Sequence, residues 1–167
     1  MALLAFISVK GKAQGQFKGE ATQTKRKGNW IPVLSFDMGV KSPRDAVTGQ
    51  ATGKRQYRPV SIIKEWGAAS PQGLTACATN EDLSEVAIEF TKTNPNGEEY
   101  VYQTVTLTDA MMVEVERFTR AQDGTLLIAA GPTGTLELEK WSFSFRKIQV
   151  DDKNGKTSFA DDWEVSV

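Results

Sequence analysis

Few side chains in this sequence are able to carry out acid–base or nucleophilic chemistry. Its 167 residues contain no histidine and a single cysteine, Cys77. Without histidine, the commonest general base and the commonest metal ligand are both absent, and a Ser–His–Asp triad cannot form. The Cys77 thiol has no imidazole to activate it, and one cysteine excludes both an internal disulfide framework and a multi-cysteine zinc site. We therefore predict no catalytic residue, no metal site and no bound cofactor.

Two groups of acidic residues come closest to a functional pattern. Glu137 and Glu139 fall on one face of a predicted strand, about 7 Å apart by strand geometry, and could be read as paired catalytic carboxylates. Such residues more often form a solvated or interface face, and no sugar-binding cleft is indicated elsewhere. Residues 151–155 with Asp161 partly match a calcium loop, but Val150 would occupy the first ligand position. A hairpin turn is the favoured interpretation of that segment.

Composition is that of an ordinary globular protein. Hydrophobic residues make up 40% of the chain, and 20 Lys and Arg against 21 Asp and Glu leave a net charge of −1. This balance gives no general attraction to nucleic acid or to an anionic membrane. The basic stretch Lys12–Lys27 could hold a phosphate group, but a solvated loop is favoured because the whole chain is not basic. We expect a single domain with a sizeable core.

The first residues, Met1–Val9, are apolar but do not form a convincing secretion signal. They lack a basic leader and a small-residue cleavage site, and their alternation suits a first strand. No apolar run approaches the roughly 20 residues needed to cross a membrane. We therefore expect a protein that is made in the cytoplasm and does not insert into a membrane. If it is exported, the route does not use a cleaved signal peptide.

The elements that position these residues are short strands. Trp30–Val40 and Arg58–Trp66 alternate with a period of two, which is typical of half-buried strands. Between them, Lys41–Gln56 is rich in Ser, Pro, Asp, Thr and Gly and has too few apolar residues to bury itself. Ser70 and Pro71 predict the start of a short helix, with Ser70 as its N-cap. The apolar face of that helix is assigned to Leu74, Cys77 and Ala78.

The remaining sequence predicts further strands at hairpin spacing. Asn94–Gly97 and Asn154–Gly155 are turn signals, since Asn-Gly tolerates the positive φ of tight hairpins. Gln122–Gly134 fits either a short strand or an apolar loop that packs on a partner. The pattern predicts an all-β fold, a β-barrel of two packed sheets with one short α-helix, forming a single domain over residues 1–167. The additional predicted strands are Ala2–Gly11, Asp82–Lys92, Glu98–Leu107, Val113–Phe118 after a bend at Asp109–Ala110, Leu136–Val150 and Thr157–Val167.

Several pieces of the sequence, taken in their order and spacing, resemble the haemolysin-coregulated protein (Hcp) family. The four main pieces are Trp30–Phe36, Gly53–Pro59, Ile63–Glu65 and Ala69–Gln72, and the likeness extends to Phe143–Ile148 and Asp161–Trp163. The sequence departs from the common family pattern at Tyr57, Gly67, Gly73 and Val150. These departures concern the start of the helix and one strand end, and leave the architecture unchanged.

Members of this family form the inner tube of the bacterial type VI secretion system. The resemblance implies a structural protein and not an enzyme: a β-barrel, related to phage tail tube proteins, that closes into a homohexameric ring. Rings would stack into a tube, with the spike, sheath and baseplate proteins of the system as partners. The protein would be secreted together with effector proteins and would hold them in the ring lumen. The alternative function is a monomeric β-barrel module that binds a small ligand or a glycan.

One polar segment is predicted to make the contact between stacked rings. Lys41–Gln56 is long for a connection between adjacent strands, where about 2–5 residues suffice, so we expect it to project. Its charged residues would pair with the next ring, each pair being weak alone but repeated in every subunit. An ordinary surface loop is the alternative. The candidate contact residues are Ser42, Pro43, Arg44, Asp45, Ala46, Val47, Thr48, Gly49 and Lys54.

Overall fold

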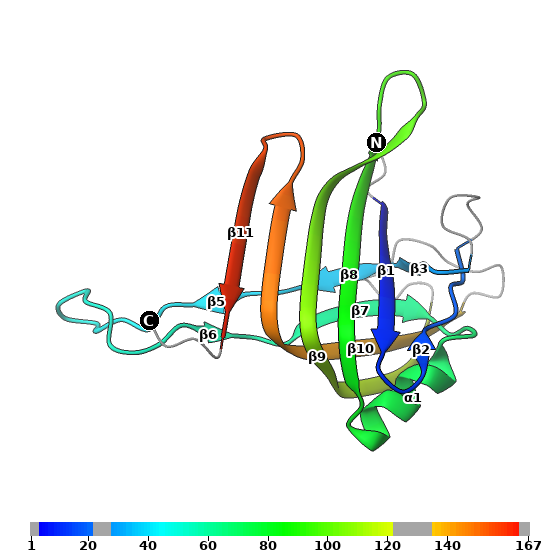
Figure 1. The fold of residues 1–167 in the computed structure, drawn as a ribbon, viewed down its shortest axis with the longest axis horizontal. Coiled ribbons are helices and arrows are strands. Elements are labelled where there is room, and N and C mark those ends of the chain that lie inside the picture. Colours follow the sequence, from blue (N-terminus) through cyan, green and yellow to red (C-terminus); the bar gives the residue numbers. More distant parts are fainter. Residues whose placement is uncertain (1–3, 22–27, 122–134, 164–167) are drawn as a thin grey trace.

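The computed structural model describes residues 4–21, 28–121 and 135–163. They form antiparallel strands and a helix, α1 (Ser70–Thr79), as Figure 1 shows. The strands are β1 (Leu4–Gly11), β2 (Gly15–Gln16), β3 (Ile31–Val33), β4 (Ser35–Asp37), β5 (Val40–Lys41), β6 (Gln56–Tyr57), β7 (Val60–Glu65), β8 (Asp82–Thr93), β9 (Glu99–Ala121), β10 (Thr135–Asp152) and β11 (Thr157–Asp162). The ambiguous segment Gln122–Gly134 lies outside the described residues. No helix in the described part of the chain is long and apolar enough to cross a membrane.

The main sheet folds over on itself. Its strand order is β2-β1-β8-β9-β10-β7-β4. The long strand β10 is shared between two partners, because residues 138–143 pair with β7 and residues 147–152 pair with β11. Residues 31–37 connect the two ends of the sheet, since β3 pairs with β1 and β4 pairs with β7. Among the described strands β1 and β7 do not pair directly, so the sheet wraps around the core without closing into a complete barrel.

The predicted all-β fold with one short helix is confirmed, but two strand boundaries differ. Glu98–Leu107 and Val113–Phe118 belong to one continuous strand, β9, because β8 and β10 hydrogen-bond to it on both sides. At the predicted bend, Asp109 has a left-handed backbone (φ 51°) and its carboxylate pairs with Arg146 at 2.8 Å. Trp30–Val40 is instead divided into β3, β4 and β5, because it changes partner from β1 to β7 and then to β6.

The core lies between the two layers of the folded sheet. Alternate residues of β10 supply its largest rings, and Trp141, Phe143 and Phe145 are all buried, as the period-two pattern predicts. The Trp141 indole packs edge-on against Phe17 and Phe143, with ring centroids 6.2 and 6.3 Å apart. Such T-shaped pairs add to the free energy of burial. The core therefore joins the segment that follows β2 to β10, late in the chain.

Helix α1 covers one end of this core with a different face from the one predicted. Its buried residues are Ser70, Gly73 and Ala76, whereas Leu74 is 41% exposed. A Cβ atom added at Gly73 would lie 2.7 Å from Cζ2 of Trp141, so the missing side chain lets the helix rest directly on the indole. Close approach of the backbone thus selects the small-residue face. Of the predicted face, Leu74 and Ala78 are exposed, which corrects the prediction, whereas Cys77 is half-buried and packs against the core as predicted.

The predicted N-cap of α1 is also wrong. The N-cap residue is Ala69, which makes no side-chain capping hydrogen bond. The Ser70 hydroxyl accepts a hydrogen bond from the Gly67 amide and donates one to Glu139, both at 3.0 Å. The Ser70 hydroxyl therefore binds the buried Glu139 carboxylate and does not cap the helix.

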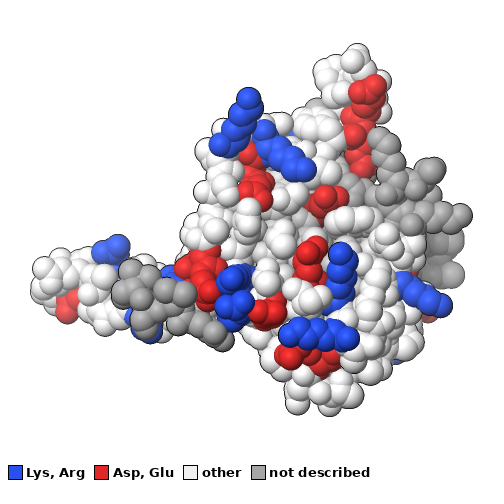
Figure 2. All heavy atoms as spheres, in the orientation of Figure 1, with Lys and Arg blue, Asp and Glu red and all other residues white. Residues whose placement is uncertain are grey.

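A narrow hairpin, which we call the arm (residues 38–58), leaves the body between β4 and β7. Its base is the two-stranded sheet of β5 and β6, followed by a single bridge between Arg44 and Ala51. Figures 1 and 2 show the arm extending well away from the rest of the molecule. Figure 2 also shows acidic and basic side chains interspersed over the face of the body, with no region dominated by one sign.

Candidate functional site

Strands β7 and β10 carry a buried ion pair. Lys64 and Glu139 face each other across the ladder, and both side chains are 0% exposed. The Lys64 ammonium donates to Glu139 Oε1 at 3.0 Å and to the Glu65 carbonyl at 2.6 Å. Glu20 Oε1 lies 3.3 Å from the same ammonium, and Arg117 Nε lies 3.3 Å from Glu139 Oε2. We call Glu20, Lys64, Arg117 and Glu139 the buried network. Its two positive and two negative charges neutralise one another.

The buried network overturns both interpretations of Glu139 as a solvated or catalytic carboxylate. Its two oxygens interact with Lys64, Arg117 and the Ser70 hydroxyl. A general acid or base must exchange a proton with a substrate within hydrogen-bond reach, and a fully buried carboxylate in ion pairs does not meet that requirement. Glu137, by contrast, is exposed. The two glutamates therefore do not form a catalytic pair.

The acidic residues of the β10–β11 connection form a hairpin turn. Asp152 accepts a hydrogen bond from the Gly155 amide at 2.8 Å, which is the main cause of a lowered pKa for its carboxyl. Asp151 accepts from the Ser158 hydroxyl at 2.6 Å, and this lowers its pKa in the same way. Within residues 4–21, 28–121 and 135–163, no cluster of three or more His, Cys, Asp or Glu side chains is placed to hold a metal ion.

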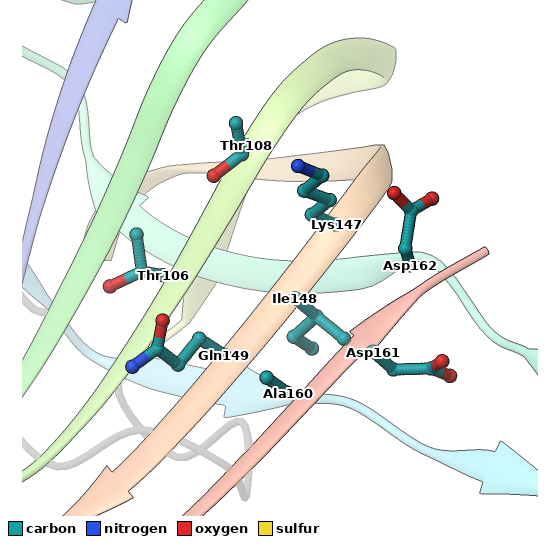
Figure 3. A pocket seen from close by; sticks show the side chains of 8 residues that line it. All are labelled: Thr106, Thr108, Lys147, Ile148, Gln149, Ala160, Asp161 and Asp162. Carbon is teal, nitrogen blue, oxygen red and sulfur yellow. The ribbon is translucent and has the colours of Figure 1, made fainter. Parts of the chain in front are cut away.

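A shallow hollow of about 240 Å³ lies beside strands β9, β10 and β11. Figure 3 shows hydroxyl, amide, ammonium and carboxylate groups around it, carried on three neighbouring strands. These groups can form hydrogen bonds, but they include no nucleophile paired with a base. The hollow is therefore not a candidate active site. Its lining residues are Thr106, Thr108, Lys147, Ile148, Gln149, Ala160, Asp161 and Asp162.

The predicted contact residues lie along the arm, and most of them are at its tip. Asp45 Oδ1 accepts hydrogen bonds from the amides of Val47 and Thr48 at 2.7 and 3.0 Å, and these bonds lower the pKa of its carboxyl. Arg44 donates to the Gly49 carbonyl at 3.2 Å. The resulting turn leaves Val47 94% exposed. The tip is thus an ordered turn that presents the large apolar side chain of Val47 among polar ones. Ala46 lies in the same turn, Ser42 and Pro43 lie on the outgoing segment between β5 and the Arg44–Ala51 bridge, and Lys54 lies on the returning segment.

At its base the arm meets the C-terminal strand through Arg55, Tyr57 and Asp161, which we call the clasp. Arg55 donates from Nε to Asp161 Oδ2 and from Nη2 to Asp161 Oδ1, the second at 2.8 Å. The Tyr57 hydroxyl donates to Asp161 Oδ2 at 2.5 Å. The Arg55 hydrogen bonds are the main cause of a lowered pKa for Asp161, while burial, followed by the bond with Asp161, raises the pKa of Tyr57 to about 12. Asp161 therefore remains ionised and Tyr57 neutral at neutral pH.

Comparison with known proteins decides the family. The family described as "Type VI secretion system effector, Hcp" matches residues 6–151. A relative named major exported protein, from Pseudomonas aeruginosa, is 32% identical over 176 aligned positions, covering 100% of this chain and 99% of the relative. The chain belongs to the Hcp family. It is therefore a structural, secreted tube protein of the type VI secretion system and not an enzyme.

Solved Hcp structures have the same fold. The secreted protein Hcp3 from Pseudomonas aeruginosa is 26% identical, with a TM-score of 0.75 and coverage of 98% of this chain and 100% of that one. Hcp1 from E. coli EAEC 042 is 23% identical, with a TM-score of 0.80 and coverage of 97% and 99%. This Hcp chain therefore keeps the family fold over nearly its whole length despite extensive sequence divergence.

Sequence reasoning missed the buried network and the clasp, although the first left a signal. Lys64 continues the buried register of β7, and Glu139 continues that of β10. A lysine and a glutamate on the apolar faces of two strands indicate a buried pair, because a lone buried charge is too unfavourable. The clasp has no comparable local signal, because Arg55 and Asp161 stand in polar stretches of the sequence, where charged side chains are expected at the surface.

Proposed function

We propose that this Hcp protein is the subunit of a tube in which six copies close head-to-tail into a ring and rings stack through their arms. The arm is the observation that carries the stacking part. It extends clear of the body (Figure 1), and its tip exposes Val47 beside the charged groups of Arg44 and Asp45. One such contact is weak, but a ring presents the contact once per subunit, so the junction gains from multivalency.

Ring closure is supported by the edge of the sheet formed by β11. This strand pairs with β10 on one side, and none of the strands in the described residues pairs with its other side. Phe159 and Trp163, at and just beyond β11, are 46% and 38% exposed. Soluble proteins cover such edges to prevent uncontrolled pairing, and a head-to-tail contact that closes on itself gives a ring. We propose that the neighbouring subunit covers this edge.

We propose the remaining parts of the function with support from membership of the secretion system. The chain acts as one domain, is made in the cytoplasm and is exported without a cleaved signal peptide. Its partners are the spike, sheath and baseplate proteins and the effector proteins that it holds in the ring lumen. The name of the Pseudomonas relative, an exported protein, supports the export step.

Replacing part of the arm tests the division between ring closure and stacking. In the variant, a short Gly-Ser linker replaces Ser42–Thr52, which leaves β5, β6 and the clasp in place. The control replaces Asn94–Gly97, the tip of the β8–β9 hairpin, in the same way. We expect the arm variant to form rings of six by light scattering but to lose tubes in electron micrographs and to lose export, while the control retains all three.

Other outcomes of this experiment are equally informative. An arm variant that still forms tubes and is still exported would make the arm an ordinary surface hairpin. Dissociation of the arm variant into monomers would assign ring closure to the arm instead. If the unmodified protein itself is a monomer at micromolar concentration, the proposed ring of six fails.

A further inference from the structure

The clasp joins the arm to β11, although the strands of the arm do not pair with that strand. Arg55 and Tyr57 belong to the arm, and Asp161 belongs to the last strand. Arg55 Nη2 also donates to the Asp162 carbonyl at 2.9 Å, so the guanidinium contacts both a side chain and the backbone of β11. Bidentate pairing of arginine with a carboxylate restricts orientation more strongly than a single hydrogen bond does. The base of the arm is thereby fixed in angle as well as in position.

Aromatic packing fixes the second arm residue of the clasp. The Tyr57 side chain is 8% exposed. Its ring lies 5.1 Å from that of Phe145 in the core and 5.3 Å from that of Trp163, centroid to centroid. The Tyr57 hydroxyl meets the same carboxylate oxygen of Asp161 as Arg55 Nε does. One carboxylate therefore holds both a charged and an aromatic residue of the arm.

The end of β11 is itself attached firmly to the body. Arg146 of β10 lies 3.3 Å from the Asp162 carboxylate and 2.8 Å from that of Asp109 in β9. The Trp163 amide donates to the Arg146 carbonyl at 2.8 Å. Asp161 is therefore presented to the arm from a strand that is tied to the central sheet. Because the end of β11 is held rigidly, a contact with Asp161 can set the direction of the arm.

Few hydrogen-bonded strand pairs within the arm itself could fix its direction. β5 and β6 pair over two residues each, and beyond them one bridge precedes the tip. A two-stranded hairpin by itself is at best marginally stable in water. We propose that Asp161 is a positioning residue for the arm, which through Arg55 and Tyr57 fixes the direction in which the arm leaves the body. Its consequence for ring stacking rests on the proposed function of the arm tip.

Distance measurements between spin labels test the positioning directly. Labels are placed at Ala46→Cys on the arm tip and Asn96→Cys on the β8–β9 hairpin, in a Cys77→Ser background, and labelled subunits are diluted with unlabelled ones. We expect a narrow distance distribution for the parent and at least a doubling of its width with Asp161→Ala. Amide exchange in residues 40–57 is expected to accelerate about tenfold, as for the loss of a charged hydrogen bond.

Two further variants separate the clasp from general damage. Arg55→Met changes only an arm residue, so we expect the body to stay folded and the distance distribution to broaden as it does in Asp161→Ala. The double variant Arg55→Met/Asp161→Ala should broaden it little further, because both changes remove the same contact. Asp37→Ala removes another charged pair at the base of the arm, Asp37–Arg58 at 3.1 Å, which is exposed and does not involve Asp161 or β11. This control should leave the width unchanged.

The results distinguish the positioning role from the function of the arm. A distribution that stays narrow with both Asp161→Ala and Arg55→Met would overturn the positioning role, even if tubes require the arm. Broadening equal to that of Asp37→Ala would overturn it as well. If the clasp variants broaden the distribution while arm replacement leaves tubes intact, the positioning role stands and the stacking function fails.

Discussion

Removing Lys64 from the buried network should destabilise the protein more than any single surface change. Lys64→Met keeps a side chain of similar length in a fully buried position but removes the ammonium 3.0 Å from Glu139. The Glu139 carboxylate, also 0% exposed, then keeps only the Ser70 hydroxyl at 3.0 Å and Arg117 at 3.3 Å. Breaking a buried pair from one side reduces stability by about 3–5 kcal/mol, because the remaining charge is left uncompensated.

The lower end of that range is expected, because Arg117 still neutralises part of the charge. Arg117 is 38% exposed, so water weakens its attraction for the carboxylate. A loss of about 3 kcal/mol corresponds to a decrease in melting temperature of about 6–12 °C for a chain of this size. The double variant Lys64→Met/Glu139→Gln should lose less than the single one, since it also removes the uncompensated charge.

Urea unfolding followed by tryptophan fluorescence measures this loss, at one fixed protein concentration because self-association raises apparent stability. The control is Lys12→Met, which removes an exposed pair with Asp82 at 4.0 Å and should change stability by less than about 1 kcal/mol. If Lys64→Met is no more destabilising than Lys12→Met, the buried network does not hold the strands together as described.

Three further predictions concern single residues. Gly73→Ala should lower the melting temperature. The new Cβ would lie 2.7 Å from the Trp141 ring, so overpacking should cost the upper part of about 1–3 kcal/mol and outweigh the helix gain of about 1 kcal/mol. Gly53→Ala, with no atom within 4 Å of the new Cβ, should not lower it, and equal melting temperatures of the two variants would contradict this reasoning. Arg55 is the main cause of the lowered pKa of Asp161, so this carboxyl stabilises the fold above its unfolded pKa of about 4, and the stabilisation is lost as pH falls. The free energy of unfolding, measured from pH 7 to pH 3, should therefore decrease less steeply in Asp161→Asn than in the parent. The Tyr57 phenol stabilises the fold below about pH 10, and this stabilisation is lost as pH rises toward its folded pKa of about 12. In an ultraviolet titration of the tyrosines, Tyr57→Phe should remove the phenol that ionises last. An unchanged titration curve would refute the raised pKa.

The separate elements could be predicted because their signals are local. Period-two alternation identified β7, β8 and the buried rings of β10, and the polar stretch Lys41–Gln56 marked the segment that forms most of the arm. Ordered motifs such as Trp30–Phe36 and Gly53–Pro59 indicated the family, which the matched region 6–151 confirms. The missing histidines excluded the common catalytic arrangements. All of these are properties of residue type and spacing along the chain.

Tertiary structure alone decided which residues meet. The face that α1 buries depends on the Trp141 indole beneath Gly73, and the Ser70 hydroxyl serves Glu139 because a strand far along the chain brings that carboxylate to it. Pairing of Arg55 with Asp161 depends on where β11 lies beside β10. Cross-strand register and helix placement minimise the energy of the whole core, so local sequence specifies the strands, while the packing of distant residues specifies their partners.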